Sequence, residues 1–483
     1  MARLDTIRTR QFDVVVIGGG IIGAGVARDA ALRGFSVALF EKSDYGSGTT
    51  AGSTRLIHGG LRYLEMFDFG LVRMDLRERE TLLRIAPHLV KPLEFLIPFY
   101  GTSIFGRAKL HAGMVVYDLL SYDKTLPQYR GLSKTEVLQA EPALRPEGLK
   151  GGVAYFDAQV ESPERLAVAN IVDARAVGAA ALNYAEVTGG LSDTRGVTGV
   201  RVHDLTDGAD GEVRAKVVVN ASGPWFNRVA SRVEPASNHA IRTTKGIHFA
   251  CPPLTNRAVV LFSPVDRRLF FVIPLLGLGW VGTTDTDFED DPGEAAATPG
   301  DVKYLIESAG GFIPRVRETP MHWTNAGVRA LVMQGGRESD VSRSHRIDSS
   351  PGLVSIMGGK ITGFRAIAEE AVNEAARQLS ASPRCRTAER MLPGRGEPED
   401  LGSTVERAVK EEQCLHVSDF LLRRSSIGFQ ADQGLEVAPE VARHMAGLLG
   451  WGAATVESEL AAYRDWVWRT REPLEGLRSA VVR

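Results

Sequence analysis

The sequence predicts an α/β protein: a doubly wound, Rossmann-like domain, an inserted antiparallel-sheet domain and a C-terminal all-helical domain. Three observations lead to this prediction. Between Phe12 and Lys42, an apolar run passes directly into a glycine-rich turn and an alanine-rich segment. Short β-rich runs separated by turn residues occupy 241–288, as in antiparallel sheets. Residues 417–483 have helical spacing and composition throughout.

The segment Phe12 to Lys42 has the order of elements that is typical of a dinucleotide site. Its apolar, β-branched start predicts a buried parallel strand. Gly18, Gly20 and Gly23 follow with the spacing G-x-G-x-x-G. In such a motif the first glycine allows a tight turn, the second lets a pyrophosphate approach the backbone, and the third lets helix and strand pack closely.

The helix after this turn is expected to run from Ile21 to Arg33, where Gly34 ends it. Its free N–H groups and positive dipole end would meet the pyrophosphate. Glu41 ends the second apolar strand, 18 residues after Gly23, and its carboxylate can accept hydrogen bonds from both ribose hydroxyls. The motif does not separate FAD from NAD, and the alternative is a structural βαβ unit without a ligand.

Composition narrows the class of protein. The chain has 483 residues, enough for two or three domains, and is 44% hydrophobic and 24% charged, as in globular proteins with a large core. A net charge of −2 gives no global electrostatic case for nucleic acid. Cys251, Cys385 and Cys414 are isolated, so no metal centre is expected, and the thiols suit a reducing cytosol.

No signal peptide is expected, because the N-terminus passes straight into the first strand. The most apolar run, Leu269 to Gly282, is too short for a spanning helix and contains Pro274. Any membrane contact is therefore expected to be peripheral.

Two segments before residue 125 have distinctive patterns. Thr49 to Tyr63 combines small and hydroxylated residues with a histidine and two glycines, which indicates a loop around a ligand, and 62–85 then predicts a helix. Phe105 to Tyr122 predicts another helix, with basic residues beside apolar ones. Such a helix can lie on a membrane surface, but the pattern favours the alternative, a cap helix packed on its neighbour.

Two later strands also end in small-residue turns. Val213 to Asn220 leads into Ala221-Ser222-Gly223, and Leu353 to Met357 leads into Gly358-Gly359-Lys360. Both turns permit close approach to a cofactor, and the second opens a helix and so forms a further anion site. Residues 382–400, rich in Pro, Gly and charge, predict a linker to the helical domain.

Four sequence blocks resemble the FAD-dependent glycerol-3-phosphate dehydrogenases, which belong to the D-amino-acid-oxidase-like flavoenzymes. The blocks are GGGIIGAG at 18–25, TRLIHGGLRYLE at 54–65, VVNASGPW at 218–225 and GGKITGFRAIAE at 358–369. The resemblance covers nearly the whole chain and implies FAD as the cofactor. The chain departs from the family pattern at Ala330, where a proline is usual, and at Gly363, where a second threonine is usual.

The resemblance also implies a domain organisation. It comprises a discontinuous FAD-binding domain of 11–95, 151–230 and 344–381, a substrate or cap domain of 96–150 and 231–343, and a helical domain of 395–483. The implied FAD-binding residues are Gly18, Gly20, Ile21, Ile22, Gly23, Glu41, Lys42, Thr49, Thr50, Ser53, His58, Gly59, Ala221, Gly223, Gly359, Lys360, Ile361 and Thr362.

Oxidation of glycerol 3-phosphate at C2 requires a group that holds the phosphate dianion. Arginine suits this task because its planar fork binds phosphate oxygens bidentately. The resemblance places Arg62, Arg329 and Arg343 in contact with the substrate, with Arg268 and Lys360 near the site. A surface ion pair is the alternative for any single arginine.

The reaction also requires a base for the hydroxyl proton, and histidine fits. His58 is the first choice and His248 the second, with a structural histidine as the alternative for each, and Arg329 is counted with them at the reaction centre. Tyr63 is expected to shape the pocket or orient the substrate. Hydride chemistry at a flavin needs no metal.

The expected function is therefore FAD-dependent oxidation of sn-glycerol 3-phosphate to dihydroxyacetone phosphate, with hydride passing from C2 to flavin N5 and electrons to a quinone. The alternatives are an oxidase that reduces O₂ and a dehydrogenase of a related 2-hydroxy acid. A flavin-binding regulator without turnover is a further class, against which the basic cluster argues. The expected location is cytoplasmic, with a peripheral contact on the inner face of the membrane, and a homodimer is a possible assembly.

Overall fold

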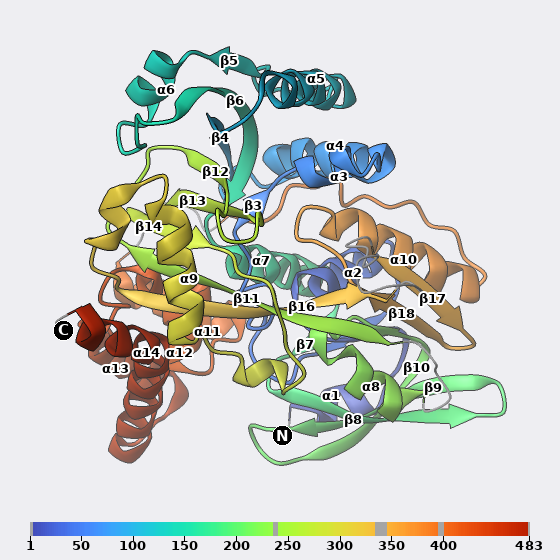
Figure 1. Ribbon diagram of the computed structural model, residues 1–483. Coiled ribbons are helices and arrows are strands. Elements are labelled where there is room, and N and C mark those ends of the chain that lie inside the picture. Colours follow the sequence, from blue (N-terminus) through green and yellow to red (C-terminus); the bar gives the residue numbers. More distant parts are fainter. Residues whose placement is uncertain (1–2, 235–239, 334–344, 395–399, 482–483) are drawn as a thin grey trace.

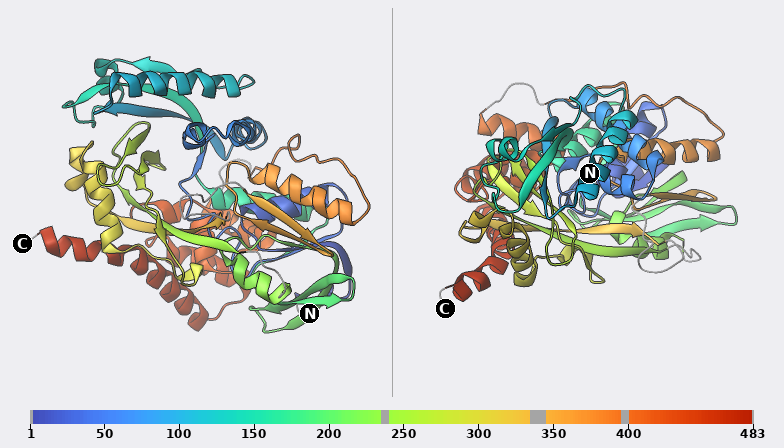
Figure 2. Two further views of the ribbon diagram at one scale, coloured as in Figure 1. Left: turned by 45° about the vertical axis from the view of Figure 1, so that its right-hand side comes forward. Right: turned by 45° about the horizontal axis from the view of Figure 1, so that its top comes forward.

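The computed structural model describes residues 3–234, 240–333, 345–394 and 400–481. These residues form two sheets with helices packed around them (Figure 1). Two further views show the C-terminal helices gathered beside the second sheet, away from the helices α4 and α5 of the opposite end (Figure 2). The α/β class with a helical C-terminal region is thus confirmed.

The first sheet has the doubly wound pattern. Its strands, in spatial order, are β17 (Arg346–Ser350), β18 (Leu353–Met357), β10 (Asp210–Asn220), β1 (Gln11–Ile17), β2 (Val37–Phe40) and β7 (Ala180–Leu182), and the hairpin of β8 (Ala185–Asp193) and β9 (Gly196–Asp204) extends from β10. The strands from β18 to β7 run parallel, while β17 is antiparallel. Parallel neighbours align the carboxyl ends of these strands along one edge, where ligands bind in such sheets.

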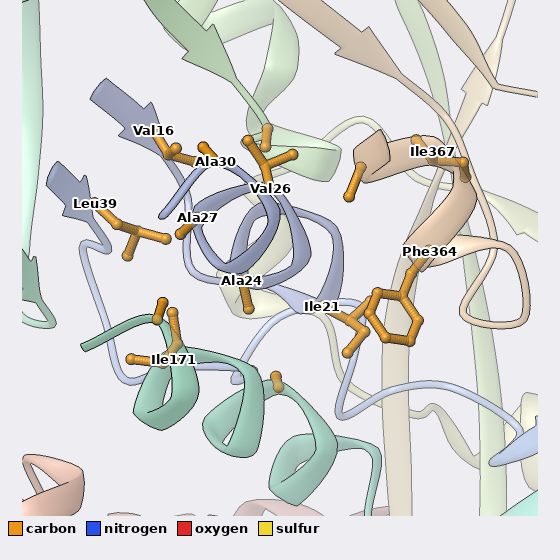
Figure 3. Close-up of a cluster of buried hydrophobic side chains, with 14 of the residues drawn as sticks. Val16, Ile21, Ala24, Val26, Ala27, Ala30, Leu39, Ile171, Phe364 and Ile367 are labelled. Carbon is orange, nitrogen blue, oxygen red and sulfur yellow. The ribbon is translucent and has the colours of Figure 1, made fainter. Parts of the chain in front are cut away.

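Helices cover both faces of this sheet. α2 (Ile21–Leu32), α7 (Pro163–Ala176) and α10 (Phe364–Gln378) pack on one face, and α1 (Asp5–Arg8) and α8 (Phe226–Val233) on the other. Ala24 and Ala27 of α2 are fully buried between β1 and the two neighbouring helices (Figure 3). Small side chains allow this close approach: a Cβ added at Gly25 would lie 3.0 Å from the ring of Phe364. This close packing fixes the position of α2 directly after the glycine turn at Gly18–Gly20.

The second sheet is mainly antiparallel. Its strands are β15 (Thr286–Asp287), β11 (Ile241–Cys251), β14 (Leu278–Gly282), β13 (Leu269–Leu275), β12 (Ala258–Phe262), β4 (Val90–Tyr100), β6 (Leu149–Val160) and β3 (Leu56–Ile57), with β16 (Trp323–Val332) paired to β11 and β5 (Arg130–Leu132) to β6. Only β4 and β12 pair in parallel among these described strands. Because β3, β4 and β6 belong here, the segments 11–95 and 151–230 contribute to both sheets, and the domain boundaries stay a prediction.

The helix expected over 62–85 is interrupted. It forms α3 (Leu61–Glu65) and α4 (Phe69–Ile85), because Phe67 has a φ of +58° and the Asp68 carboxylate caps α4 by accepting from the Leu71 N–H. α5 (Ile104–Leu120) covers this pair, and α6 (Lys134–Ala140) follows. α9 (Pro299–Gly310) packs against the second sheet.

The C-terminal region is mainly helical, but residues 425–437, which were expected to be helical, form turns and a short 3-10 helix (Ile427–Phe429). Its helices are α11 (Leu401–Glu412), α12 (Val417–Asp419), a π-helical turn (Phe420–Arg424), α13 (Ala438–Leu449) and α14 (Ala453–Val481). They enclose a separate apolar core around Val405, Phe420 and Met445. Across the described ranges, no helix is both long and apolar enough to cross a membrane.

Candidate active site

One cavity of about 400 Å³ lies between the two sheets. The residues that follow β1, β2, β10 and β18 line one side of it. Residues of β13 and β16, the segment 283–285 after β14, and the loop between β2 and β3 line the other. The cavity therefore opens at the carboxyl edge of the parallel strands, as the doubly wound topology predicts.

The glycine turn faces this cavity. Gly18 has a φ of +104°, and a Cβ added at Gly23 would lie 2.0 Å from the Gly18 carbonyl oxygen. At Gly20 the only neighbour within 4 Å of an added Cβ, among the residues that the structure describes, is the Thr50 hydroxyl, at 3.6 Å. The Ile21 N–H donates to that hydroxyl at 3.0 Å. Gly18 and Gly23 are thus required by the backbone conformation and by close backbone packing, whereas Gly20 leaves open space at the N-terminus of α2.

Glu41 is held in place by backbone donors. Its Oε2 accepts from the Gly19 N–H at 2.6 Å, and its Oε1 accepts from the Ser43 N–H at 2.9 Å. Burial raises the pKa of Glu41, and these two donors oppose the rise. Beside it, the Lys42 ammonium lies 4.0 Å from the centre of the Trp225 ring. An open glycine turn, a helix N-terminus and a fixed acid together fit a dinucleotide.

The other two predicted turns reach the same cavity. Gly223 has a φ of +56° and Gly359 a φ of +110°, and both line it. The Thr362 hydroxyl accepts from the His58 N–H at 3.1 Å, so the third turn fixes the loop that carries the histidine.

Most of the predicted site residues line this cavity. They are Gly18, Gly20, Ile21, Ile22, Glu41, Lys42, Thr49, Thr50, Ser53, His58, Tyr63, Ala221, Gly223, Arg268, Arg329, Gly359, Lys360, Ile361 and Thr362. Gly23 and Gly59 lie behind the lining. Arg343 lies outside the described residues, and Arg62 is placed in α3 with its side chain outside the described part. The roles of all these residues stay predictions.

Two arginines meet at one acid. Arg329 donates to the Asp285 carboxylate at 3.0 Å and to the Thr283 hydroxyl at 2.8 Å. The Arg268 guanidinium donates to the Asp285 carbonyl oxygen. Room for Arg329 comes from Gly246, because an added Cβ there would lie 2.1 Å from the guanidinium. Asp285 and Gly246 were missed from the sequence, although Asp285 lies in the GTTDT segment that follows β14.

Lys360 is a further basic residue on the cavity wall. The Lys360 ammonium lies 2.8 Å from the Asp75 carboxylate and 3.5 Å from the centre of the Tyr63 ring. Asp75 is fully buried, and burial raises its pKa to about 6 although Lys360 acts in the opposite direction. This acid was also missed, since 285 residues separate it from Lys360.

His58 lines the cavity with its neighbours fixed. Its ring stands edge-on to Phe271, with centroids 6.2 Å apart. The Gly59 N–H donates to the Tyr117 hydroxyl at 2.9 Å, which in turn donates to the buried Asp157 carboxylate at 2.7 Å. The histidine loop is thus anchored from α5 and β6. No sequence spacing links these three residues, so this anchor was not predicted.

His248 lies away from the cavity surface. It is buried, its ring stacks on Trp280 with centroids 4.9 Å apart, and its Nε2 is 3.1 Å from the Thr54 hydroxyl. Burial, with help from Arg329 and Arg55, holds the pKa of His248 well below its usual value. The geometry therefore favours His58 over His248 as the base.

Known families match almost the whole chain. Residues 13–369 match the family described as FAD dependent oxidoreductase, and residues 368–456 match the C-terminal domain of alpha-glycerophosphate oxidase. A glycerol-3-phosphate dehydrogenase of Synechocystis sp. is 40% identical over 416 residues, which span 82% of this chain and 75% of the relative. The chain belongs to the FAD-dependent glycerol-3-phosphate dehydrogenase family. An aerobic glycerol-3-phosphate dehydrogenase of Staphylococcus haemolyticus is 34% identical over 89% of this chain and 80% of its own.

A solved structure agrees with this family assignment. The glycerol-3-phosphate dehydrogenase of Bacillus halodurans, crystallised with FAD, superposes with a TM-score of 0.81 at 26% identity and covers 98% of this chain and 97% of its own. FAD is the cofactor, as the sequence predicted, and the glycine turn with Glu41 and the two later turns are the residues that fit it.

Both departures from the family pattern lie at this site. Ala330 lines the cavity. Gly363 lies beside Met74 and Asp75. An added Cβ would lie 3.1 Å from Met74 Cε and 3.4 Å from Asp75 Oδ1, which has no hydrogen-bond partner among the described residues. A hydroxyl at position 363 could therefore donate a hydrogen bond to Asp75 Oδ1.

Replacement of Gly363 by serine should make the protein about 1 kcal/mol more stable than Gly363→Ala at pH 7.5, a typical net hydrogen-bond contribution, because both variants place a Cβ beside Met74 and only serine adds a donor. Asp75 has a folded pKa of about 6, above the ordinary 3.8, so its ionisation lowers stability as pH rises between those values. A donated hydrogen bond favours the ionised form, and the gain should thus be smaller at pH 4.5. Urea unfolding measures it, with Gly363→Ala as the control that adds only a Cβ. Equal gains for both variants at both pH values would contradict the bond.

Proposed function

We propose that the protein oxidises sn-glycerol 3-phosphate to dihydroxyacetone phosphate. One observation carries the proposal: a single cavity has a pyrophosphate-type turn at one end and the basic side chains of Arg329, Arg268 and Lys360 elsewhere on its wall. A dinucleotide needs only the first, so the second basic group indicates a second anionic ligand. The relatives named as glycerol-3-phosphate dehydrogenases support this substrate.

Each residue then has a defined task. Bound FAD supplies the hydride acceptor, flavin N5. Arg329 presents its guanidinium to the substrate phosphate, and the Thr283 hydroxyl and Asp285 carboxylate fix its direction. His58 accepts the proton of the C2 hydroxyl, because it is the candidate base on the cavity wall. Lys360, stacked over Tyr63, adds positive charge beside the developing negative charge on oxygen.

Anaerobic reduction of the flavin tests this function. Glycerol 3-phosphate should bleach the flavin absorbance completely within seconds, whereas lactate, as a simple 2-hydroxy acid, should leave it oxidised over the same time. Bleaching by lactate at the same rate, or none by glycerol 3-phosphate, would overturn the proposal. Peroxide production in air measures whether O₂ replaces a quinone as the acceptor.

Arg329→Ala is expected to lower kcat/KM for glycerol 3-phosphate by about ten- to a hundred-fold. A charge-assisted hydrogen bond to phosphate is worth about 1.5–3 kcal/mol, and about 1.4 kcal/mol is tenfold. Arg329→Lys should recover only part of the loss, since lysine has no bidentate fork. Steady-state kinetics with glycerol as a second substrate provide the contrast, because glycerol has no phosphate to lose.

The matched control for Arg329 is Arg195→Ala, which removes an arginine that is 86% exposed and lies outside the cavity. It should change neither substrate's kinetics. Equal losses for glycerol and glycerol 3-phosphate in Arg329→Ala, with FAD retained, would place Arg329 in the chemistry or the fold and not in phosphate binding.

We further propose that the electron acceptor is a membrane quinone and that the protein contacts the cytoplasmic face of the membrane peripherally. The support is an exposed apolar surface on α5 and the turn between α3 and α4, which lie together at the top of Figure 1. Phe67, Phe105, Leu119 and Tyr122 are 70–82% exposed there. This cluster, the α5 face, continues directly from α3, whose Leu61 and Tyr63 line the cavity.

Both sequence interpretations of α5 have structural support. Met114 and Tyr117 are buried against α3 and α4, as expected for a cap helix. The opposite side carries the exposed apolar residues together with the exposed Lys109. Apolar side chains with a basic residue among them match the boundary between lipid tails and anionic headgroups.

The double variant Phe105→Ser/Leu119→Ser should lower the vesicle-bound fraction, measured by flotation with anionic liposomes. Burial of each large side chain is worth about 1.5–3 kcal/mol, so binding should weaken about tenfold or more. Turnover with a water-soluble dye should not change. The control is Val265→Ser, which removes an apolar residue that is 63% exposed in the turn between β12 and β13. Undiminished flotation of the double variant would exclude the α5 face as the contact.

A further inference from the structure

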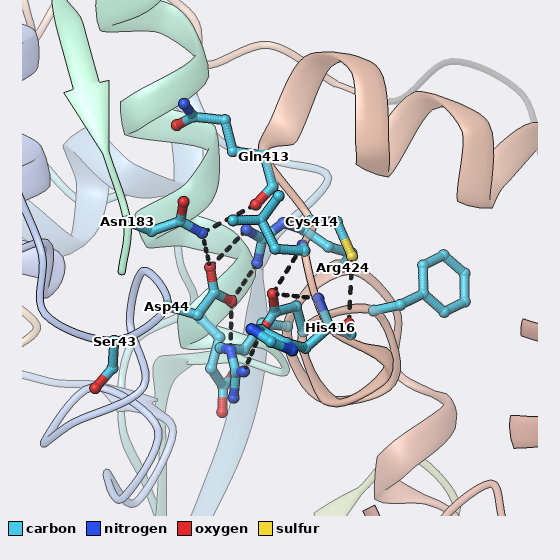
Figure 4. Close-up of polar contacts among 12 residues, drawn as sticks. Ser43, Asp44, Asn183, Gln413, Cys414, His416 and Arg424 are labelled. Atoms are coloured by element: carbon cyan, nitrogen blue, oxygen red, sulfur yellow. Dashed lines mark hydrogen bonds and ion pairs between the residues drawn. The ribbon is translucent and has the colours of Figure 1, made fainter. Parts of the chain in front are cut away.

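A buried cluster of charges joins the C-terminal domain to the segment that follows β2. The Asp44 carboxylate is fully buried, and Arg424 donates to both of its oxygens, at 2.6 and 2.7 Å (Figure 4). Arg423 donates to the same carboxylate at 2.5 Å, and the Asn183 amide at 2.9 Å. Two of these three partners come from the π-helical turn Phe420–Arg424, so the contact crosses between domains.

The arginines are themselves fixed on the C-terminal side. Arg424 also donates to the Glu412 carbonyl oxygen at 2.8 Å, and Arg423 pairs with Asp419 at 2.7 Å. Burial alone would raise the pKa of Asp44, but the two guanidinium groups hold it well below its usual value. Asp44 is therefore charged across the accessible pH range and is matched by a fixed positive field. Such a bidentate pair defines position as well as charge.

The next residue makes a second, uncharged link. Tyr45 is fully buried, and its hydroxyl donates to the side-chain oxygen of Gln413 at 2.6 Å. Gln413 ends α11 with a φ of +53°, and its backbone carbonyl accepts from the Asn183 amide at 2.9 Å. Three residues of the C-terminal domain, Gln413, Arg423 and Arg424, thus bind Asp44 and Tyr45.

The segment that holds Asp44 and Tyr45 in turn packs against the glycine turn at Gly18–Gly20. The Tyr45 ring lies directly beneath Gly19, where an added Cβ would be 2.7 Å from it. The Gly46 N–H donates to the Gly19 carbonyl at 3.0 Å, and the Gly19 N–H donates to Glu41 at 2.6 Å. The segment 41–46 therefore forms one hydrogen-bonded unit with the glycine turn, and residues 47–50 after it line the cavity.

We propose that Arg424 and Gln413 of the C-terminal domain are positioning residues for FAD, which hold Asp44 and Tyr45 so that the glycine turn and Glu41 keep their binding geometry. None of these four side chains lines the cavity, so they act through Gly19 and Glu41. Without the contacts of Arg424 with Asp44 and of Gln413 with Tyr45, the 41–46 segment gains conformational freedom, which FAD binding must then remove. The C-terminal domain is thereby part of the FAD site in energetic terms, without a contact to the cofactor.

The inference concerns FAD affinity, so its test does not depend on the substrate. Apoprotein is titrated with FAD by the quenching of flavin fluorescence, and FAD release from the holoprotein is timed well below the melting temperature. Tyr45→Phe removes one hydroxyl without changing charge, and should raise the FAD dissociation constant about fivefold or more. Asp44→Asn should raise it further, by about tenfold or more, and Arg424→Lys should fall between wild type and Asp44→Asn, since it keeps the charge and loses the bidentate pair.

The control variant is Thr324→Val. It removes another hydrogen bond to the C-terminal domain, from the Thr324 hydroxyl to the Thr470 carbonyl at 2.7 Å, far along the chain from the 41–46 segment. Thr324→Val should lower the melting temperature of the apoprotein without accelerating FAD release. If Asp44→Asn does not fold, Tyr45→Phe decides. Unchanged FAD affinity and release rate in folded Tyr45→Phe, or an equal change in Thr324→Val, would overturn the proposal and leave the cluster as a domain contact.

Discussion

Gly20→Glu should give a folded, colourless protein that binds no FAD. An added side chain at Gly20 points into open cavity space, where the Thr50 hydroxyl lies 3.6 Å from its Cβ. That space lies at the N-terminus of α2, where a pyrophosphate would accept hydrogen bonds from backbone N–H groups. A glutamate there both fills the volume and places a like charge against the phosphates, which costs several kcal/mol. A loss of at least about a thousandfold in affinity follows, since about 1.4 kcal/mol is tenfold.

Absorbance of the purified protein measures the result, because oxidised flavin is yellow. Gly447→Glu is the matched control: Gly447 is an exposed residue of α13, and within the described part of the chain no atom outside its own helix backbone lies within 4 Å of an added Cβ. Its variant should be as yellow as wild type. Circular dichroism must show that Gly20→Glu is folded. A yellow Gly20→Glu protein with normal FAD affinity would move the pyrophosphate away from this turn.

The elements that sequence predicted well are those whose signals are local. The order of β1, glycine turn, α2 and β2 lies within 31 consecutive residues, and its hydrophobic and glycine spacing acts over single turns. Strand partners were not predictable in the same way. β3, β4 and β6 join the second sheet through pairings across more than fifty residues, and no local pattern records which sheet a strand enters.

The same distinction separates the predicted from the missed site residues. His58 and Lys360 lie in two of the four sequence blocks shared with the family, Arg329 lies in the segment AGVRAL at 326–331, which also resembles the family, and all three line the cavity. Their partners Asp285 and Asp75 were missed, because which acid a cation meets depends on tertiary contacts. His248 shows the limit for strands: nearly all of β11 is buried on both faces, so alternation could not tell which side chain reaches the cavity.

His58→Asn is expected to lower kcat with glycerol 3-phosphate by about a hundred- to ten-thousandfold, the usual range for loss of a positioned general base. FAD should remain bound, since the backbone contact from His58 to Thr362 does not involve the imidazole. A base must be neutral to accept the proton, so wild-type kcat should fall on the acidic side of the pH profile, where the base becomes protonated. In His58→Asn that acidic limb should disappear, and residual activity should be nearly flat with pH.

His248→Asn provides the decisive comparison. His248 is buried against Trp280, and its pKa is held well below the usual value, so it stays neutral in the folded protein across the working pH range. Its replacement removes a buried stacking contact and should therefore lower the melting temperature while the acidic limb persists. His203→Asn, at a histidine of β9 that pairs with Asp210 at the surface, should change neither stability nor pH profile. Loss of the acidic limb in His248→Asn, with the limb intact in His58→Asn, would instead assign the base to His248 and require that side chain to reach the cavity during turnover.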